Sequence, residues 1–300
     1  MLHVSIVDHA NTADLLRCLA TLPAACEGID WRLSVIENVA ATDVSAVRAA
    51  VPEAEVLVNP RPLGFGANHN QVLRRLLADP ATDHVLVLND DTELPAGSIA
   101  ALVRCLDAHP EAGAASPRLV DAEGREQTVL LRFPTVLGEV RAALGRPGEV
   151  GAAGDGWLTG ACLLLRVEAL RRVGLFDERF FLFYEDTDLS ARLRAGGWAR
   201  IVCGGSRVVH RGHATVGASH FGTTMDRQMA RSQYLYVAKH HGALAAETVR
   251  RATRAARAAR AVKAVAEARR HPGEEAQQHA AFLRELAAYD ARRALPHEAA

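Results

Sequence analysis

The sequence predicts an α/β fold with a mainly parallel β-sheet flanked by helices, followed by a C-terminal helical extension. In the first half of the chain, short apolar segments alternate with segments of helical periodicity. The apolar segments are continuous, as expected for strands covered on both faces. From about residue 224 the chain is rich in Ala and Arg, which favour helix, with a break at Pro272-Gly273. We therefore expect two domains, residues 1–225 and 226–300.

The elements of the first domain are short and follow one another along the chain. Strands are expected at residues 3–7, 32–36, 55–58 and 84–88. Helices are expected at residues 11–22, from a cap at Thr42 or Asp43 to about residue 50, at 67–77 and at 98–109. Residues 121–156 are rich in Gly and Pro and are expected to be loops with a strand or short helix. Further on we expect strands at 157–165, 201–203 and 207–210, and helices at 167–173 and 188–195.

Polar residues follow the expected strands at their carboxyl ends. They are Asp8-His9, Glu37-Asn38, Gly64-Phe65-Gly66 and Asn89-Asp90-Asp91. In open α/β sheets, ligands bind in the crevice outside these strand ends. We therefore expect all four groups to line one crevice.

The group Asn89-Asp90-Asp91-Thr92 ends a buried strand. Two adjacent carboxylates repel each other, and a divalent cation relieves that repulsion. Oxygen ligands of this kind suit Mg²⁺ or Mn²⁺, which commonly join a protein to a diphosphate. The alternative is a solvated turn after a strand, because Asn and Asp are good turn formers.

A segment of aromatic and acidic residues runs from Phe176 to Asp188 and contains Glu185-Asp186. Carboxyl groups near aromatic side chains can have a raised pKa, which suits a general base. The alternative is a structural role, in which Asp186 or Thr187 caps the following helix. Both roles can coexist if Asp186 is the base and Asp188 supports the first helical turn.

Two histidines, His210 and His213, follow a short strand with the spacing needed for metal ligation or phosphate contact. The alternative is an ordinary surface histidine, since the chain has 13 histidines. The sequence Gly64-Phe65-Gly66 has the wrong spacing for a dinucleotide-binding loop, and no phosphate-binding P-loop motif is present.

The composition limits the class of protein. A formal net charge of +0 gives no general reason to expect a nucleic-acid partner. The five cysteines are far apart and lack a C-x-x-C pair, which argues against a disulfide framework and is typical of a reducing cytosol. No signal peptide or transmembrane segment is expected, so we expect a cytoplasmic protein.

The zero net charge is a balance of two regions. Residues 250–270 contain eight basic and one acidic side chain, a net charge of +7, and the remainder of the chain therefore carries −7. Basic helices can lie on an anionic membrane or bind an acidic partner. The alternative is a helix that packs its Ala face on the body of the protein or on a second subunit.

Taken in order, these motifs resemble the family 2 glycosyltransferases, which have the GT-A fold. The resemblance extends over residues 4–215, is most specific at 174–196, and is strongest for the rhamnosyltransferase-type branch. Its motifs lie at Asn59-Pro-Arg-Pro-Leu-Gly-Phe-Gly-Ala-Asn-His-Asn70, Val87-Leu-Asn-Asp-Asp-Thr92, Gly160–Arg166, Gly174–Gly196 and Val208–His210.

The resemblance implies an inverting transfer from a dTDP-, UDP- or GDP-sugar, with Mg²⁺ or Mn²⁺, to a saccharide, lipid-linked or natural-product acceptor. It implies that Asp186 is the catalytic base and that Asp91, with His210, holds the metal. The implied donor-binding residues are Asp8, Glu37, Asn38, Gly64, Asn68, Asn70, Asp90, Trp157, Gly160, Ala161 and Glu185. Glu37 stands where the family has Asp, and residues 39–41 are one residue longer than the pattern, which affects the contacts to the nucleotide.

Two other functions fit parts of this pattern. A nucleotidyltransferase has a similar α/β nucleotide-binding body, but it releases pyrophosphate and needs no base on the acceptor side. A catalytically inactive sugar-nucleotide-binding scaffold has dispensable acidic residues and uses the helical extension as an adaptor. For the enzyme we expect a cytoplasmic location or a peripheral one at the inner face of the membrane.

Overall fold

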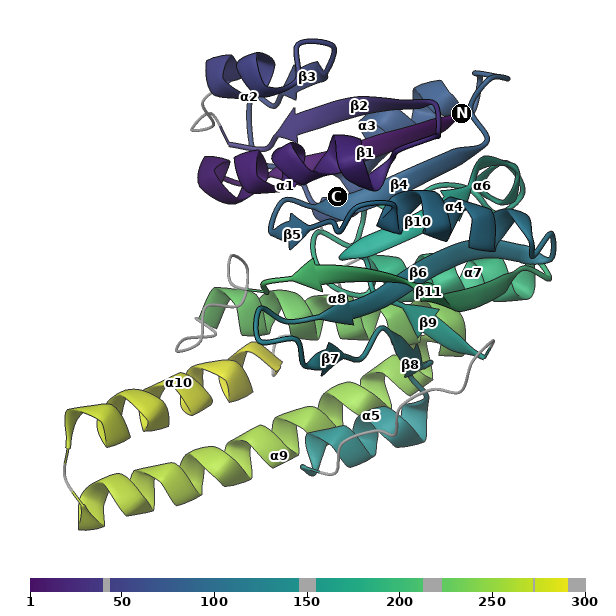
Figure 1. Cartoon of the computed structure of the whole chain (residues 1–300). Coiled ribbons are helices and arrows are strands. Elements are labelled where there is room, and N and C mark those ends of the chain that lie inside the picture. Colours follow the sequence, from purple (N-terminus) through teal and green to yellow (C-terminus); the bar gives the residue numbers. More distant parts are fainter. Residues whose placement is uncertain (40–43, 146–154, 213–222, 272, 291–300) are drawn as a thin grey trace. The chain divides into compact units, whose positions relative to one another are not determined.

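The computed structural model describes residues 1–39, 44–145, 155–212, 223–271 and 273–290 (Figure 1). The chain forms two compact units. The first, called here the sheet unit, is Met1–Phe133, Val150–Phe181 and Glu185–Ala218. The second, called the helical unit, is Pro134–Glu149, Leu182–Tyr184 and Ser219–Ala300. The helical unit thus includes two segments that the sequence analysis assigned to the first domain. Thr42, Asp43 and His213 lie outside the described residues.

The sheet unit contains a mixed β-sheet with strand order β3-β2-β1-β4-β10-β6-β11-β5, and β7 pairs with β6. Its first four strands in this order are parallel, as predicted, and β11 is parallel to β6. Strand β10 is antiparallel to both of its neighbours, β4 and β6. The bounds are β1 (Leu2–Asp8), β2 (Trp31–Glu37), β3 (Glu55–Val58), β4 (His84–Asn89), β5 (Thr92–Glu93), β6 (Ala112–Val120), β7 (Glu126–Gln127), β10 (Cys162–Arg166) and β11 (Ala199–His210).

Helices cover both faces of this sheet, which explains the continuous apolar strands. In β4, Leu86 and Leu88 belong to one core cluster, whereas Val85 and Val87 belong to the other. The first cluster includes residues of α1 (Thr12–Ala25) and α4 (Ser98–Asp107). The second includes residues of α3 (Phe65–Leu76), α6 (Val167–Val173) and α7 (Glu185–Ala195). A further helix, α2 (Val44–Ala50), precedes β3.

Several boundaries differ from the sequence prediction in ways that affect the site. Helix α7 begins at Glu185 rather than Asp188, so the acidic motif forms its first turn. The segment expected as one strand at 157–165 is two strands, β9 (Gly156–Leu158) and β10, separated by a turn. Strand β9 pairs with β8 (Leu130–Arg132), which lies in the segment expected to contain loops with a strand or short helix. The two short strands expected after residue 200 form the single strand β11, with an irregularity between Cys203 and Arg207.

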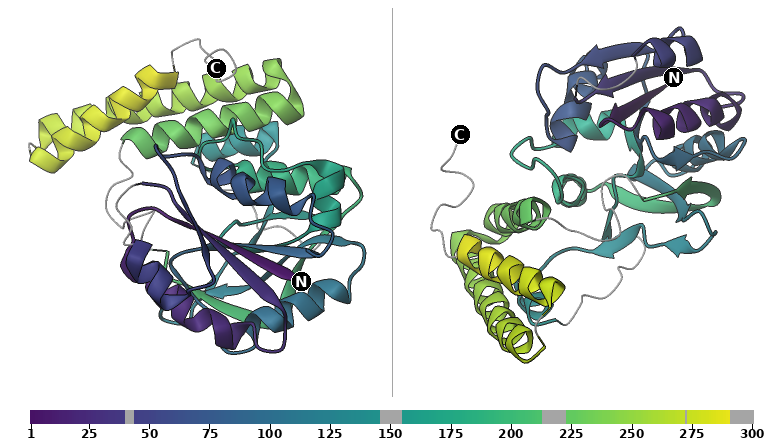
Figure 2. Two further views of the ribbon diagram at one scale, coloured as in Figure 1. Left: turned by 90° about the horizontal axis from the view of Figure 1, so that it is seen from above. Right: turned by 90° about the vertical axis from the view of Figure 1, so that its left-hand side faces the viewer.

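The helical unit consists of four helices among the described residues. They are α5 (Val136–Ala143), α8 (Thr223–His241), α9 (Ala243–Arg270) and α10 (Glu274–Asp290). Helices α9 and α10 run side by side (Figure 2) and bury Ala261, Ala264, Ala280 and Leu283 between them. The predicted break between the last two helices is confirmed. None of the helices within the described ranges has the length and apolar character needed to cross a membrane.

Residues Leu182–Tyr184 belong to the helical unit and have a constrained backbone. The Ser232 hydroxyl donates to the Leu182 carbonyl at 2.8 Å. The Tyr184 hydroxyl donates to Glu139 at 3.3 Å, and its ring lies 5.5 Å from that of Tyr236. Phe183 and Tyr184 have φ values of +67° and +66°, a left-handed conformation that is costly for residues other than Gly. These contacts therefore hold a strained segment that immediately precedes α7 in the chain.

One disulfide joins Cys105 of α4 to Cys203 of β11. Cys18, Cys26 and Cys162 are free and buried, as expected for small core residues. The expectation that the cysteines do not pair is wrong for this one pair. The two residues are 98 positions apart, and only the packing of α4 on β11 brings their Cα atoms to 6.2 Å.

Candidate active site

Asp90 and Asp91 lie in the turn between β4 and β5 and are both buried, with 8% and 5% of their surface exposed. Burial raises the pKa of Asp90 to about 8, and the neighbouring carboxylates of Asp91 and Asp8 add to the effect. The Oδ1 atom of Asp91 is buried and makes no hydrogen bond. Asp91 therefore presents a carboxylate oxygen without a hydrogen bond at this strand end.

His210 comes to the same place from the end of β11, where it pairs with Thr92 of β5. Its Nε2 atom lies 3.4 Å from Asp91 Oδ1 and 3.4 Å from the side-chain amide nitrogen of Asn89. Its Nδ1 atom lies 2.8 Å from the side-chain oxygen of Gln127. The structure thus brings together the two residues that the sequence nominated as metal ligands.

Few of the described side chains at the end of β4 could ligate a metal ion. Among the described residues, no group of three or more His, Cys, Asp or Glu side chains is arranged to hold a metal ion by itself. Mg²⁺ typically binds proteins through one or two carboxylates and completes its shell with water and substrate phosphates. The unpaired Asp91 oxygen and His210 Nε2 therefore fit a metal whose remaining ligands come from a diphosphate and from water.

Asp186 is half-buried in the first turn of α7, and its carboxylate accepts three hydrogen bonds. The Gly160 amide donates to Oδ2 at 3.0 Å, and the Thr187 amide donates to Oδ1 at 2.7 Å. The Thr187 hydroxyl also donates to Oδ1, at 3.3 Å. Burial raises the pKa of Asp186 to about 6, and these hydrogen bonds limit the rise. The group is ionised near neutral pH and remains accessible, as a general base must be.

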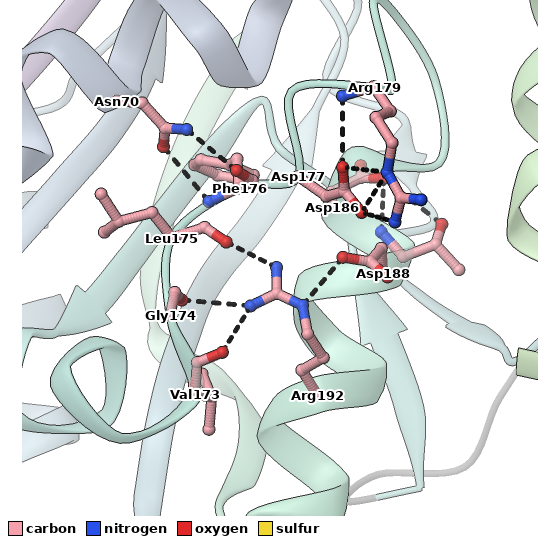
Figure 3. Close-up of polar contacts among 11 residues, drawn as sticks. Asn70, Val173, Gly174, Leu175, Phe176, Asp177, Arg179, Asp186, Asp188 and Arg192 are labelled. Atoms are coloured by element: carbon pink, nitrogen blue, oxygen red, sulfur yellow. Dashed lines mark hydrogen bonds and ion pairs between the residues drawn. The ribbon is translucent and has the colours of Figure 1, made fainter. Parts of the chain in front are cut away.

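Asp188 and Glu185 have different surroundings from Asp186. Asp188 is fully buried and accepts a hydrogen bond from Arg192 at 2.8 Å. Arg192 also donates to the carbonyl oxygens of Val173, Gly174 and Leu175 (Figure 3). Glu185 is 5% exposed, and burial beside Asp186 raises its pKa well above the ordinary value. Asp188 is therefore structural, and Asp186 is the accessible carboxylate of the turn.

The turn at Gly160-Ala161 connects the Asp90-Asp91 pair at the end of β4 with Asp186 of α7. The amide of Asn89, next to Asp90, donates to the Ala161 carbonyl at 2.9 Å. The next residue back, Gly160, donates its amide to Asp186. A Cβ atom on Gly160 would lie 3.2 Å from the Phe65 ring, so the turn passes close to the start of α3. Because β10 runs antiparallel to β4, this turn lies beside the carboxyl end of β4 and brings Asp186 to the same edge.

Asp8 and Glu37 are partners in the β1–β2 register at the same sheet edge and are both buried. Asn38 follows β2, and its side chain forms two hydrogen bonds with Leu63 in the loop ahead of α3. Its oxygen accepts from the Leu63 amide at 2.8 Å, and its nitrogen donates to the Leu63 carbonyl at 3.0 Å. The predicted nucleotide-side residues are therefore together, and Asn38 is tied to the loop ahead of α3.

Asn68 and Asn70 project from α3 and bind protein atoms. Asn68 donates to the carbonyls of Leu63 and Gly64 at 3.1 and 3.0 Å. Asn70 donates to the Phe176 carbonyl at 2.9 Å and accepts from the Phe176 amide at 3.2 Å (Figure 3). These two side-chain amides fix the conformation of the loop and the position of the aromatic segment. Any effect of Asn68 or Asn70 on sugar-nucleotide binding therefore acts through the position of the loop.

Gly64 and Trp157 complete the predicted set. A Cβ atom on Gly64 would lie 2.5 Å from the Phe181 carbonyl oxygen, and the adjacent Phe65 amide donates to that oxygen at 2.8 Å. Only Gly permits this close approach. Trp157 is half-buried in β9, and its indole nitrogen donates to the Arg132 carbonyl at 3.1 Å. The sequence does not point to Gln127, because this residue lies among the expected loops of residues 121–156 and belongs to no recognised motif.

A family model described as "Glycosyltransferase like family 2" matches residues 10–235. The chain belongs to glycosyltransferase family 2. This family 2 glycosyltransferase is 30% identical, over 270 residues, to the N-acetylglucosaminyl-diphospho-decaprenol L-rhamnosyltransferases of two strains of Mycobacterium tuberculosis. The match covers 80% of this chain and 85% of theirs. The predicted family and its rhamnosyltransferase-like character are confirmed.

Solved structures agree on the fold of this glycosyltransferase. The mannosyltransferase PcManGT from Pyrobaculum calidifontis, in complex with GDP-Man and Mn²⁺, matches with a TM-score of 0.56 and 18% identity. That match covers 96% of this chain and 85% of the mannosyltransferase. GalNAc-T7 with UDP, GalNAc and Mn²⁺ matches with a TM-score of 0.53 and 13% identity, over 80% of this chain and 51% of that one. The predicted GT-A fold is confirmed, and the enzyme transfers a sugar from a nucleotide sugar.

Proposed function

We propose that this glycosyltransferase moves a rhamnose-type deoxyhexose from a nucleoside-diphosphate sugar to an acceptor hydroxyl, with inversion at the anomeric carbon and with Mg²⁺ or Mn²⁺. One observation carries the proposal: the accessible Asp186 carboxylate and the Asp91–His210 pair lie at one sheet edge, joined through the Gly160-Ala161 turn. A single displacement needs a base on the acceptor side and charge neutralisation on the leaving side. Asp186 can supply the base, and Asp91 with a bound cation can supply the charge neutralisation.

Asp186 takes the proton from the attacking acceptor hydroxyl. The hydroxyl oxygen forms the new bond to the anomeric carbon while the bond to the diphosphate oxygen breaks, and the nucleoside diphosphate leaves. The hydrogen bonds from Gly160 and Thr187 keep the carboxylate ionised and oriented for this transfer. Because acceptor and leaving group are on opposite faces of the sugar, one displacement inverts the anomeric carbon.

Asp91 and His210 would hold the cation, which when bound offsets the negative charge that develops on the departing diphosphate. Asp90 lies beside them with a pKa raised to about 8. At neutral pH its protonated carboxyl group can therefore donate a hydrogen bond to the sugar nucleotide. We assign Asp8, Glu37 and Asn38 to the nucleotide. The sugar pocket is assigned to Trp157, Gly160, Ala161 and Glu185, and the supporting loop to Gly64, Asn68 and Asn70.

For the acceptor we propose a lipid-linked saccharide, because the mycobacterial relatives are named for a diphospho-decaprenol acceptor. Helix α9 supports a location at an anionic membrane surface. It carries the +7 segment, and among the described residues Arg254, Arg269 and Arg270 are exposed without a carboxylate partner. Leu244 and Val262 on this helix are 87% and 72% exposed. Cationic and apolar side chains exposed together suit a shallow contact with anionic lipid.

The reaction products test this proposal. We expect incubation with dTDP-, UDP- or GDP-rhamnose, Mn²⁺ and an N-acetylglucosaminyl-diphospho-lipid analogue to release nucleoside diphosphate from one of the three donors. ¹H NMR of the glycolipid should show the anomeric configuration opposite to that of the donor. When a nucleoside triphosphate and a sugar 1-phosphate replace these substrates, release of pyrophosphate would favour a nucleotidyltransferase. Retention of configuration would contradict the single displacement, and no turnover with any donor would favour the scaffold.

A further inference from the structure

Gln127 binds His210 on the side of the imidazole that faces away from Asp91. The Gln127 side-chain nitrogen donates to the backbone carbonyl of His210 at 2.8 Å. Since a carbonyl only accepts hydrogen bonds, this contact orients the Gln127 amide with its nitrogen toward the backbone. The Gln127 side-chain oxygen is then the atom 2.8 Å from His210 Nδ1.

This orientation determines which ring nitrogen carries the proton. An amide oxygen only accepts, so Nδ1 must be the N–H that donates to it. In the neutral ring, the lone pair therefore lies on Nε2, the atom 3.4 Å from Asp91 Oδ1. The Asn89 side-chain nitrogen, a donor, lies 3.4 Å from the same Nε2 and agrees with this assignment.

The strand pairing explains why Gln127 is available for this contact. Strand β7 pairs with β6 through Leu119↔Gln127. The ladder between β6 and β11 ends at Val120↔Val209, one residue before His210. Within the described residues, the β6–β11 ladder does not reach the His210 carbonyl, which accepts from the Gln127 side chain instead.

We propose that Gln127 is a positioning residue that keeps His210 in the Nδ1–H tautomer, with the Nε2 lone pair on the side of Asp91, so that both residues can ligate a divalent cation. This inference rests on the proposed metal-assisted function. A ring with its proton on Nε2 would donate to Asp91 and could not ligate a cation. Residues that hold a metal-binding histidine in this way commonly change metal affinity by 10- to 100-fold when they are replaced.

The test measures Mn²⁺ binding without turnover, by electron paramagnetic resonance of the protein with a nucleoside diphosphate. Gln127→Met retains the side-chain length but removes donor and acceptor, and we expect it to weaken Mn²⁺ binding by about 10- to 100-fold. Gln127→Glu retains an acceptor for Nδ1–H, and we expect it to stay within about threefold of the wild type. Gln277→Met, at an exposed position of α10, is the matched control and should have no effect.

A second measurement tests the tautomer itself, in metal-free protein at a pH where the ring is neutral. Two-dimensional ¹H–¹⁵N NMR should show His210 protonated at Nδ1 in the wild type and in Gln127→Glu, and a mixture of tautomers in Gln127→Met. Wild-type Mn²⁺ affinity in Gln127→Met, or an Nε2–H ring in the wild type, would overturn the inference. If the wild type does not bind Mn²⁺ but shows the Nδ1–H ring, the proposed metal assistance fails while the tautomer assignment stands.

Discussion

Three carboxylates in one helical turn have three different environments. Asp188 is fully buried against Arg192, Glu185 is buried with one unpaired oxygen, and Asp186 is half-buried with both oxygens bound by backbone amides. Asp186 therefore remains ionised and reachable, whereas its neighbours hold the turn or are shielded. The division of roles follows from burial and hydrogen bonding at single residues.

The pKa of Asp186 leads to a prediction about the pH dependence of transfer. A general base works only when it is deprotonated, and burial raises the pKa of this group to about 6. We expect kcat to be constant above this pH and to fall about tenfold for each pH unit below it. Steady-state kinetics at saturating sugar nucleotide and acceptor measure this decrease in kcat at low pH. The residual activity of Asp186→Asn should not decrease at low pH in this way. The same decrease in that variant would show that another group causes it.

At the level of the element, α7 is attached to the preceding loop by Arg192. This side chain pairs with buried Asp188 and donates to three consecutive carbonyl groups at residues 173–175 (Figure 3). The loop leads into the aromatic segment ahead of the acidic first turn of α7. The geometry of that turn therefore depends on the contacts of Arg192 with Asp188 and with this loop.

Arg192→Leu should lower the free energy of unfolding by about 3–5 kcal/mol, because it removes the cation that forms an ion pair with the buried Asp188 carboxylate. Chemical denaturation monitored by circular dichroism measures this change. Arg172→Leu is the matched control, since Arg172 pairs with Glu168 at an exposed position of α6 and should contribute less than about 1 kcal/mol. Equal effects of the two substitutions would contradict a specific role for the Arg192 contact.

Helix α9 leads to a second prediction at this scale. Replacing Arg254, Arg269 and Arg270 with Gln should weaken binding to anionic phosphatidylglycerol vesicles by about 100-fold, at about 1 kcal/mol for each cation. Vesicle co-sedimentation measures the loss, and added salt should reproduce it in the wild type. The same three changes at Arg48, Arg104 and Arg172 of the sheet unit serve as the control. Unchanged vesicle binding, or loss of a dimer in sedimentation velocity instead, would assign the helix to a contact between protein copies.

For the whole molecule, the sequence predicts most of the parallel half of the sheet, because its strands are local apolar runs that end in polar turns. Strand β6 was missed because Ala112–Val120 contains Gly and Pro and few branched residues. Its small residues serve close packing: a Cβ atom on Gly113 would lie 2.9 Å from both Leu193 and Trp198. This requirement comes from α7 and from a loop far along the chain, so no local pattern reveals it.

The site was predictable to the same extent. Asp91 and Asp186 belong to motifs that can be recognised locally, and the structure brings them to one edge. The contacts of Gln127, the internal bonds of Asn68 and Asn70, and the Cys105–Cys203 disulfide all join segments that are distant in the chain or depend on side-chain orientation. Residue spacing contains no information about such contacts.

The central claim is that Asp186 acts on the acceptor while Asp91 acts on the donor. The most direct measurement compares transfer rate and donor affinity in Asp186→Asn and Asp91→Asn, with calorimetry for the donor in the presence of Mn²⁺. We expect Asp186→Asn to lower kcat by about 10²- to 10⁴-fold with an unchanged donor Kd, and Asp91→Asn to lose donor binding that depends on Mn²⁺. An Asp186→Asn enzyme that turns over at the wild-type rate would contradict the account.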